Sequence, residues 1–140
     1  MPYIDDLKPA LIREFGDSRF RFYQPAPHIA ITRIEGRIVA EMAVLFTEVC
    51  DMAIGHEAPH IGLHDWLDVE SFDMSAPGKI AAWAIPRVSK MERVIVATNN
   101  PIVGMAVRTA NLTVKKIEQS SSRAELGHAL KRALSGPAQS

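Results

Sequence analysis

A run of β-branched residues followed by a strong helix start constrains this 140-residue chain more than any other feature. Residues 94–97 read Val-Ile-Val-Ala, and such a run is typical of a strand covered on both faces, as in a parallel sheet. Asn100 and Pro101 follow, and asparagine at the N-cap with proline at the first helical position predicts a helix. A buried strand leading into a helix is the repeating unit of an α/β protein.

The rest of the chain supports the same alternation. Period-two patterns predict strands over residues 19–23 and 28–35, which can pair as a hairpin through the loop at 24–27. Apolar residues at three- and four-residue steps predict a helix from Ile38 to Ala53. The remaining signals predict a strand at 59–63, a helix over 80–85 that Pro86 ends, a strand at 112–117, and a helix opened by the capping box Ser122–Glu125.

Three expectations concern segments with less regular patterns. Pro9 is expected to open a short helix that runs through Phe15. The helix after Pro101 is apolar nearly all round, so we expect it to be largely buried. The polar segment from His64 to Ser75 is expected to be a loop at the carboxyl edge of the sheet, where open α/β sheets bind ligands.

Length and charge favour one domain without a nucleic-acid partner. The length suits a single domain, and 47% hydrophobic residues are enough for one core. The 16 basic and 16 acidic residues balance, whereas nucleic-acid surfaces need concentrated positive charge. No apolar run approaches the roughly 20 residues of a membrane span, and no cleavable leader pattern begins the chain. A cytoplasmic location is therefore expected.

The order of elements, a hairpin followed by strand–helix units, resembles the STAS domain, the fold of the anti-sigma-factor antagonist SpoIIAA. His-Asp-Trp at 64–66, Trp83 and the stretch NNPIVGMAVRTANL at 99–112 look like an uncharacterised bacterial SpoIIAA-like group. That group is described as STAS-like or related to CRAL-TRIO lipid-transfer domains. The resemblance implies one α/β domain over 18–135, with an N-terminal antiparallel hairpin, a mixed, mostly parallel sheet and about four helices. Residues 1–17 would be an extension and 136–140 a frayed tail.

The STAS resemblance also implies a regulatory switch. In switch members of that family, a partner kinase phosphorylates a serine or threonine at the start of the helix after the third strand, and the added charge changes partner docking. The matching segment runs from Ser71 to Gly78, and Ser75 is the best candidate. The family pattern of an Asp-Ser pair is interrupted here by Met74. The alternative interpretation is that Ser75 only caps the helix.

His64 and Asp65 suggest general acid–base chemistry, because an imidazole beside a carboxylate can move protons. Consecutive strand residues point to opposite faces, however, which favours separate structural roles. His60 and His64 would share a strand face about 13 Å apart, at ~3.3 Å per residue, too far to bind one ion. No metal site is therefore predicted, and no dinucleotide or phosphate-loop motif predicts a cofactor.

Aromatic and polar residues gather near the same edge. Trp66, Phe72, Met74 and Trp83 either belong to the core or line an apolar pocket, and Asn99 and Asn100 open the next helix. The preferred hypothesis is a non-catalytic regulatory module that binds a protein partner, either a kinase or a regulatory protein. The alternatives are a module that binds a lipid or small apolar ligand between the helices, and a small enzyme using His64 and Asp65. Oligomerisation stays open.

Overall fold

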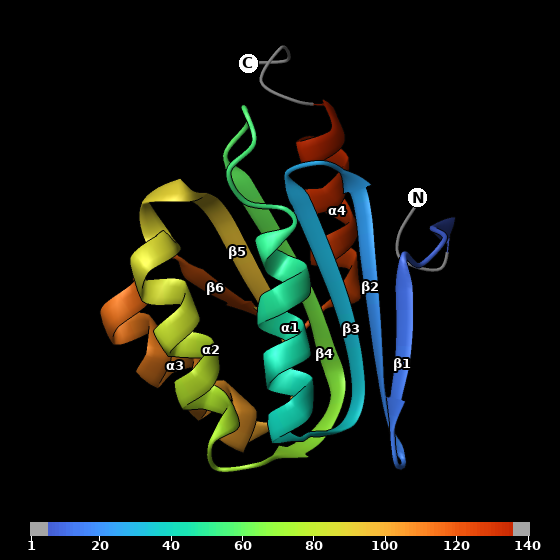
Figure 1. Ribbon diagram of the computed structural model, residues 1–140, viewed down its shortest axis with the longest axis vertical. Coiled ribbons are helices and arrows are strands. Elements are labelled where there is room, and N and C mark those ends of the chain that lie inside the picture. Colours follow the sequence, from blue (N-terminus) through green and yellow to red (C-terminus); the bar gives the residue numbers. More distant parts are fainter. Residues whose placement is uncertain (1–5, 136–140) are drawn as a thin grey trace.

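The computed structural model describes residues 6–135, which form one sheet with helices on both faces (Figure 1). The six strands lie side by side in chain order: β1 (Leu11–Phe15), β2 (Ser18–Ala26), β3 (Ile29–Ile38), β4 (His60–Phe72), β5 (Met91–Ala97) and β6 (Ile117–Ser120). β1 to β3 pair antiparallel, and β3 to β6 pair parallel. The predicted α/β class with an N-terminal hairpin and a mostly parallel sheet is confirmed. The expected frayed tail at 136–140 lies outside the described residues.

The helices divide unequally between the two faces of the sheet. They are α1 (Ala40–Asp51), α2 (Ala76–Ala84), α3 (Pro101–Val114) and α4 (Arg123–Ser135), with a 3₁₀ turn (Ile85–Lys90) after α2 at Pro86. From β3 to β6, each new parallel strand lies next to the one before it, and the order runs in one direction across the sheet. Right-handed crossovers therefore place α1, α2 and α3 on one face. α4 follows the last strand and covers the other face (Figure 1). Within residues 6–135, no helix combines the length and apolarity needed to cross a bilayer.

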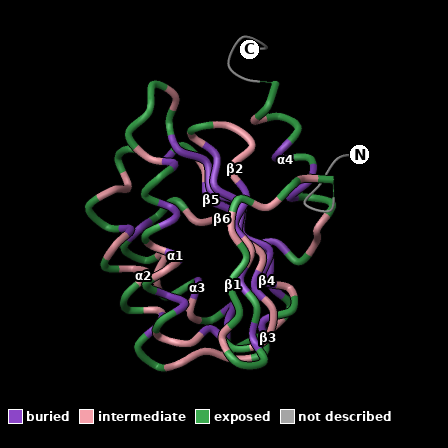
Figure 2. Tube along the Cα trace, turned by 45° about the vertical axis from the view of Figure 1, so that its right-hand side comes forward, coloured by how far each residue is buried: buried purple, intermediate pink, exposed green. Residues whose placement is uncertain are grey.

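Two apolar layers hold the helices to the sheet. Phe20, Phe22 and Ile34 pack with α1 on one face, and Ile31 and Leu63 pack with α4 on the other. Buried positions therefore concentrate along the central strands (Figure 2). In β4, His60, Gly62, His64 and Trp66 alternate with residues that face α4. This alternation decides which side chains reach the site described below.

The N-terminal helix prediction is wrong, because Leu11–Phe15 is strand β1. The strand pairs with β2 across a two-residue turn at Gly16 and Asp17, and Gly16 has a φ of 62°. A glycine–aspartate pair at a tight turn between two strands favours a hairpin, since glycine adopts left-handed φ without strain. Leu11 and Phe15 pack against the core, so part of the expected extension belongs to the sheet.

The expected loop that begins at His64 is also wrong. β4 runs for 13 residues to Phe72 and stays paired with β3 as far as Ile38. A register shift between Arg33 and Glu35 adds a residue to β4, as in a β-bulge. The polar residues that suggested a loop have partners outside β4; Arg123 Nη2 lies 2.7 Å from Asp68 Oδ2.

The helix after Pro101 differs from the prediction at its end and in its exposure. Asn100 Oδ1 accepts the amide hydrogens of Ile102 at 2.9 Å and Val103 at 3.3 Å, so the predicted cap is confirmed. α3 continues to Val114, and the strand predicted at 112–117 is wrong. Ile102 is 65% exposed, so the expectation of a largely buried helix is wrong too.

Candidate functional site: an apolar cavity under helices α2 and α3

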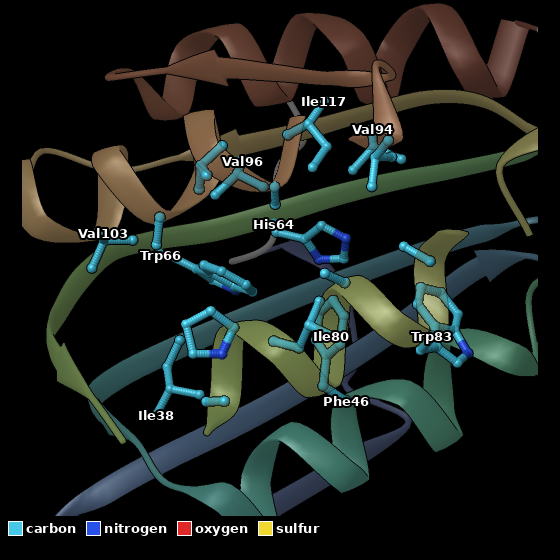
Figure 3. A pocket seen from close by; sticks show the side chains of 18 of the residues that line it. Ile38, Phe46, His64, Trp66, Ile80, Trp83, Val94, Val96, Val103 and Ile117 are labelled. Atoms are coloured by element: carbon cyan, nitrogen blue, oxygen red, sulfur yellow. The ribbon is translucent and has the colours of Figure 1, made fainter. Parts of the chain in front are cut away.

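An apolar cavity lies between helices α2 and α3 and strands β4 and β5 (Figure 3). Its volume is about 90 Å³, and part of the cavity is open to solvent. Small-molecule sites are mostly apolar with a few placed polar groups. Apart from the indole N–H groups, the polar side-chain atoms that line this cavity belong to His60 and His64. The arrangement is that of a pocket for an apolar molecule.

Short side chains on the two helices explain why the cavity exists. α2 contributes Ala76, Ala81 and Ala84 to the lining, and α3 contributes Ala106 and Ala110. These residues are good helix formers but too small to fill the space between the helices and the sheet. In the sequence, the cavity was therefore signalled only by these alanines. Alanine is also common in helices because of its high helix propensity, so the signal was ambiguous.

Aromatic rings form the inner wall. The Phe46 ring of α1 lies 4.9 Å from the ring of His64, 5.7 Å from that of Trp66 and 6.2 Å from that of Trp83, centre to centre. Trp83 Nε1 donates a hydrogen bond to Asp51 Oδ1 at 2.9 Å, which fixes the orientation of the ring. Trp66 and Trp83 both line the cavity (Figure 3), as the alternative interpretation of a ligand pocket requires.

His64 lies inside this wall and is 3% exposed. Its Nδ1 is 2.7 Å from Thr32 Oγ1, and Trp66 Nε1 donates to the same hydroxyl at 3.2 Å. Burial, together with a smaller effect of the neighbouring His60, lowers the pKa of His64 to about 3. The imidazole is therefore neutral at physiological pH and serves as a fixed polar group in an apolar wall.

His60 approaches the same point from the other side of Gly62. A Cβ atom on Gly62 would stand 2.9 Å from His64 Nε2 and 3.3 Å from His60 Nε2. The expected separation of about 13 Å, at ~3.3 Å per residue, describes the backbone and is wrong for the rings, which lean together over the glycine. Burial lowers the pKa of His60, although hydrogen bonds to the backbone of Ala53 and His28 oppose the shift. His60 was missed as a site residue, and the pattern His-x-Gly-x-His was its signal.

Asp65 points away from this site. It is fully buried on the α4 face, where Arg123 Nε donates to its Oδ2 at 2.7 Å. His64 and Asp65 therefore lie on opposite faces of β4, as the strand alternation predicts, and they do not form an acid–base pair. An enzyme mechanism built on both side chains has no support in this geometry.

The segment between β4 and α2 separates into structural and exposed residues. Asp73 Oδ2 accepts the amide hydrogen of Ala40 at 2.9 Å, so it caps α1 rather than α2. That hydrogen bond and the one from Arg37 lower the pKa of Asp73. Ser71 Oγ accepts a hydrogen bond from Arg37 Nη1. Ser75 is exposed at the N-cap of α2, and its side chain makes no capping hydrogen bond.

The remaining predicted site residues either line the cavity, make structural hydrogen bonds or are exposed. Phe72 lines the cavity, whereas Met74 is 91% exposed. Asn100 caps α3, and its Nδ2 donates to the carbonyl of Glu70, which ties the helix to β4. Asn99 is exposed beside it. Among residues 6–135, no group of three or more His, Cys, Asp and Glu side chains is arranged to hold a metal ion.

The comparison with solved structures identifies the fold as SpoIIAA-like. The chain is similar to an uncharacterised DUF3478-family protein with a SpoIIAA-like fold from Shewanella loihica PV-4, with a TM-score of 0.56 and 15% identity. The similarity covers 86% of this chain and 90% of that chain. No protein-family profile matches the sequence, and no curated protein matches it. The resemblance to the STAS and SpoIIAA-like fold is thereby confirmed.

Proposed function

We propose that this SpoIIAA-like domain is a binding module that holds a small apolar ligand in the cavity under α2 and α3. The observation that carries the proposal is a cavity whose wall is apolar except for two neutral imidazoles and the indole N–H groups. Transfer of apolar ligand surface from water into such a space is favourable by ~25 cal/mol per Å². The ligand would enter through the open side of the cavity near Trp83.

Filling the cavity from α3 is expected to abolish ligand binding. In Ala110→Phe, a side chain that lines the cavity becomes an aromatic ring that occupies the ligand volume. The matched control is Ala82→Phe, since Ala82 lies on α2 with its side chain exposed. Quenching of tryptophan fluorescence by octan-1-ol, with thermal unfolding as the folding check, measures the effect. Equal binding by both variants would contradict the proposal. Native mass spectrometry of the unmodified protein would show a bound lipid directly.

A second candidate function is the regulated protein interaction, and the exposure of Ser75 favours it. Because Ser75 gives α2 no capping hydrogen bond, its hydroxyl is accessible at the start of a helix that walls the cavity. A phosphate at this position would meet the positive end of α2.

Protein isolated from the organism that encodes it is expected to carry phosphate at Ser75, and Ser75→Asp is expected to change partner affinity by about ten-fold. Peptide mass spectrometry and titration with the co-isolated partner test this, with the exposed Ser89 changed to Asp as the control. An unmodified Ser75 and unchanged affinity in Ser75→Asp would leave only the ligand-binding function.

A further inference from the structure

His64 faces the cavity as a hydrogen-bond donor. The Thr32 hydroxyl is fully buried and accepts the Trp66 Nε1 hydrogen. Its own hydrogen then needs an acceptor, and within residues 6–135 the one in reach is His64 Nδ1, at 2.7 Å. A buried hydroxyl hydrogen without an acceptor would cost about 1–3 kcal/mol. The network therefore assigns the proton of neutral His64 to Nε2.

His60 faces the same point as an acceptor. Of the two backbone groups that raise its pKa, those of Ala53 and His28, the Ala53 carbonyl oxygen lies 3.0 Å from His60 Nδ1, and a carbonyl can only accept. The hydrogen of neutral His60 is therefore on Nδ1, which leaves a lone pair on Nε2. One neutral donor and one neutral acceptor thus meet above Gly62, where the missing side chain leaves them open to the cavity.

We propose that the cavity selects a neutral amphiphile whose hydroxyl group is held above Gly62, accepting from His64 Nε2–H and donating to His60 Nε2. This inference rests on the proposed ligand-binding function and names the class of ligand. A hydroxyl is the simplest group that donates and accepts at the same atom, so it satisfies both imidazoles. The alkyl or ring portion then fills the apolar space toward α2 and α3.

A carboxylate suits this site poorly. It would place negative charge against the lone pair of His60, and its desolvation is unfavourable without a cation. The residues that line the cavity include no Lys or Arg in the described part of the chain. An ether can accept from His64 but leaves the His60 acceptor unpaired in a buried place. The ligand class can therefore be separated from fatty acids and ethers by its head group alone.

The test is a panel of ligands with one chain length and different head groups. Tryptophan fluorescence and calorimetry at pH 7.5 measure the binding of octan-1-ol, 1-methoxyoctane and octanoate to the unmodified protein. We expect octan-1-ol to bind about ten-fold more tightly than the ether and about a hundred-fold more tightly than octanoate. Menthol carries its hydroxyl on a ring, so comparing it with octan-1-ol shows whether the site prefers a cyclic or a linear alcohol.

A substitution at Gly62 tests the position of the hydroxyl, and thermal unfolding checks that the variant folds, since the added Cβ would crowd the buried His64 ring. In Gly62→Ala, the methyl group stands between the two Nε2 atoms and keeps a ligand atom from reaching both. We expect the preference for octan-1-ol over the ether to fall to about two-fold or less, while the ether still binds. Gly78→Ala is the matched control, because nothing lies within 4 Å of the added Cβ there.

The outcomes separate this inference from the proposed function. An alcohol preference that Gly62→Ala removes and Gly78→Ala retains supports the inference. Equal binding of the three head groups, or an alcohol preference that survives in Gly62→Ala, overturns the hydroxyl assignment and leaves the ligand-binding function standing. If no member of the panel binds, both the hydroxyl assignment and the ligand-binding function are overturned.

Discussion

Replacement of Arg123 by methionine is expected to lower the free energy of unfolding by about 3 kcal/mol. Asp65 has no exposed side-chain surface, and Arg123 Nε lies 2.7 Å from its Oδ2. The methionine keeps an apolar stem of similar length but removes the cation that faces a carboxylate in the interior. Since the carboxylate that loses this 2.7 Å ion pair is fully buried, the change is more destabilising than the loss of a surface pair. Denaturant unfolding at pH 7 measures it.

Arg93→Met is the matched control. Arg123 donates one hydrogen bond to Asp65 and one to Asp68, whereas Arg93 donates both of its bonds to Glu118, whose side chain is 52% exposed. We expect a loss of less than about 1 kcal/mol there. Adding Asp65→Asn to Arg123→Met should recover part of the lost stability, because the double variant no longer buries a charge. Equal losses in the Arg123 and Arg93 variants would contradict a structural role for the buried pair.

The structural role of the Asp65–Arg123 pair explains why His64 and Asp65, neighbours in the sequence, belong to different sites. His64 and Asp65 are adjacent in the sequence, yet β4 sends one to the cavity and the other to α4. Arg123 joins Asp65 to the start of α4, so the carboxylate fixes the helix on the far face of the sheet. The apparent His-Asp pair is thus a cavity residue followed by a structural ion pair.

The parts of the fold that follow local rules could be predicted. The buried run at 94–97, the asparagine cap of α3 and the Ser122 cap of α4 each depend on residues within one element or its flank. β1 also had a local signal, the Gly16–Asp17 turn, but the preceding Pro9 suggested a helix. Local patterns therefore identified the type of most elements.

Element ends were predicted less well because they depend on distant partners. The second half of β4 is polar and looks like a loop, but Asp68 is paired with an arginine from α4, 55 residues away. The end of α3 was read as a strand because Leu112 and Val114 alternate with polar residues. The Asn111 side chain donates to the carbonyl of Ile117 through Nδ2 and accepts the Ile117 amide hydrogen at Oδ1. These two hydrogen bonds fix where α3 ends and β6 begins.

The candidate site was anticipated in outline. Trp66 and Trp83 were interpreted as either core or pocket-lining residues, and both line the cavity. The approach of His60 to His64 was not anticipated, because rise per residue measures backbone separation and ignores the room that Gly62 leaves for both rings. The cavity itself comes from the distance between α2, α3 and the sheet, which alanine spacing does not specify.

The neutral state of His64 leads to the second large expected effect, a loss of stability in mild acid. The folded-state pKa of His64 is lowered to about 3, whereas an unfolded histidine titrates near ~6.5. Between these values the unfolded chain binds one more proton at this site, so the free energy of unfolding falls as the pH falls. From pH 7.5 to pH 4.5, His64 alone should remove roughly 2–3 kcal/mol.

Comparison of variants isolates this contribution from the carboxylates that titrate in the same range. His64→Gln should flatten the pH dependence of the unfolding free energy by that roughly 2–3 kcal/mol, whatever its stability at pH 7.5. The exposed His56, changed to Gln, serves as the comparison variant. His60, whose pKa burial also lowers, keeps its own contribution in both variants. Parallel pH profiles for the unmodified protein and His64→Gln would show that His64 titrates alike in the folded and unfolded states, which contradicts a pKa lowered by burial.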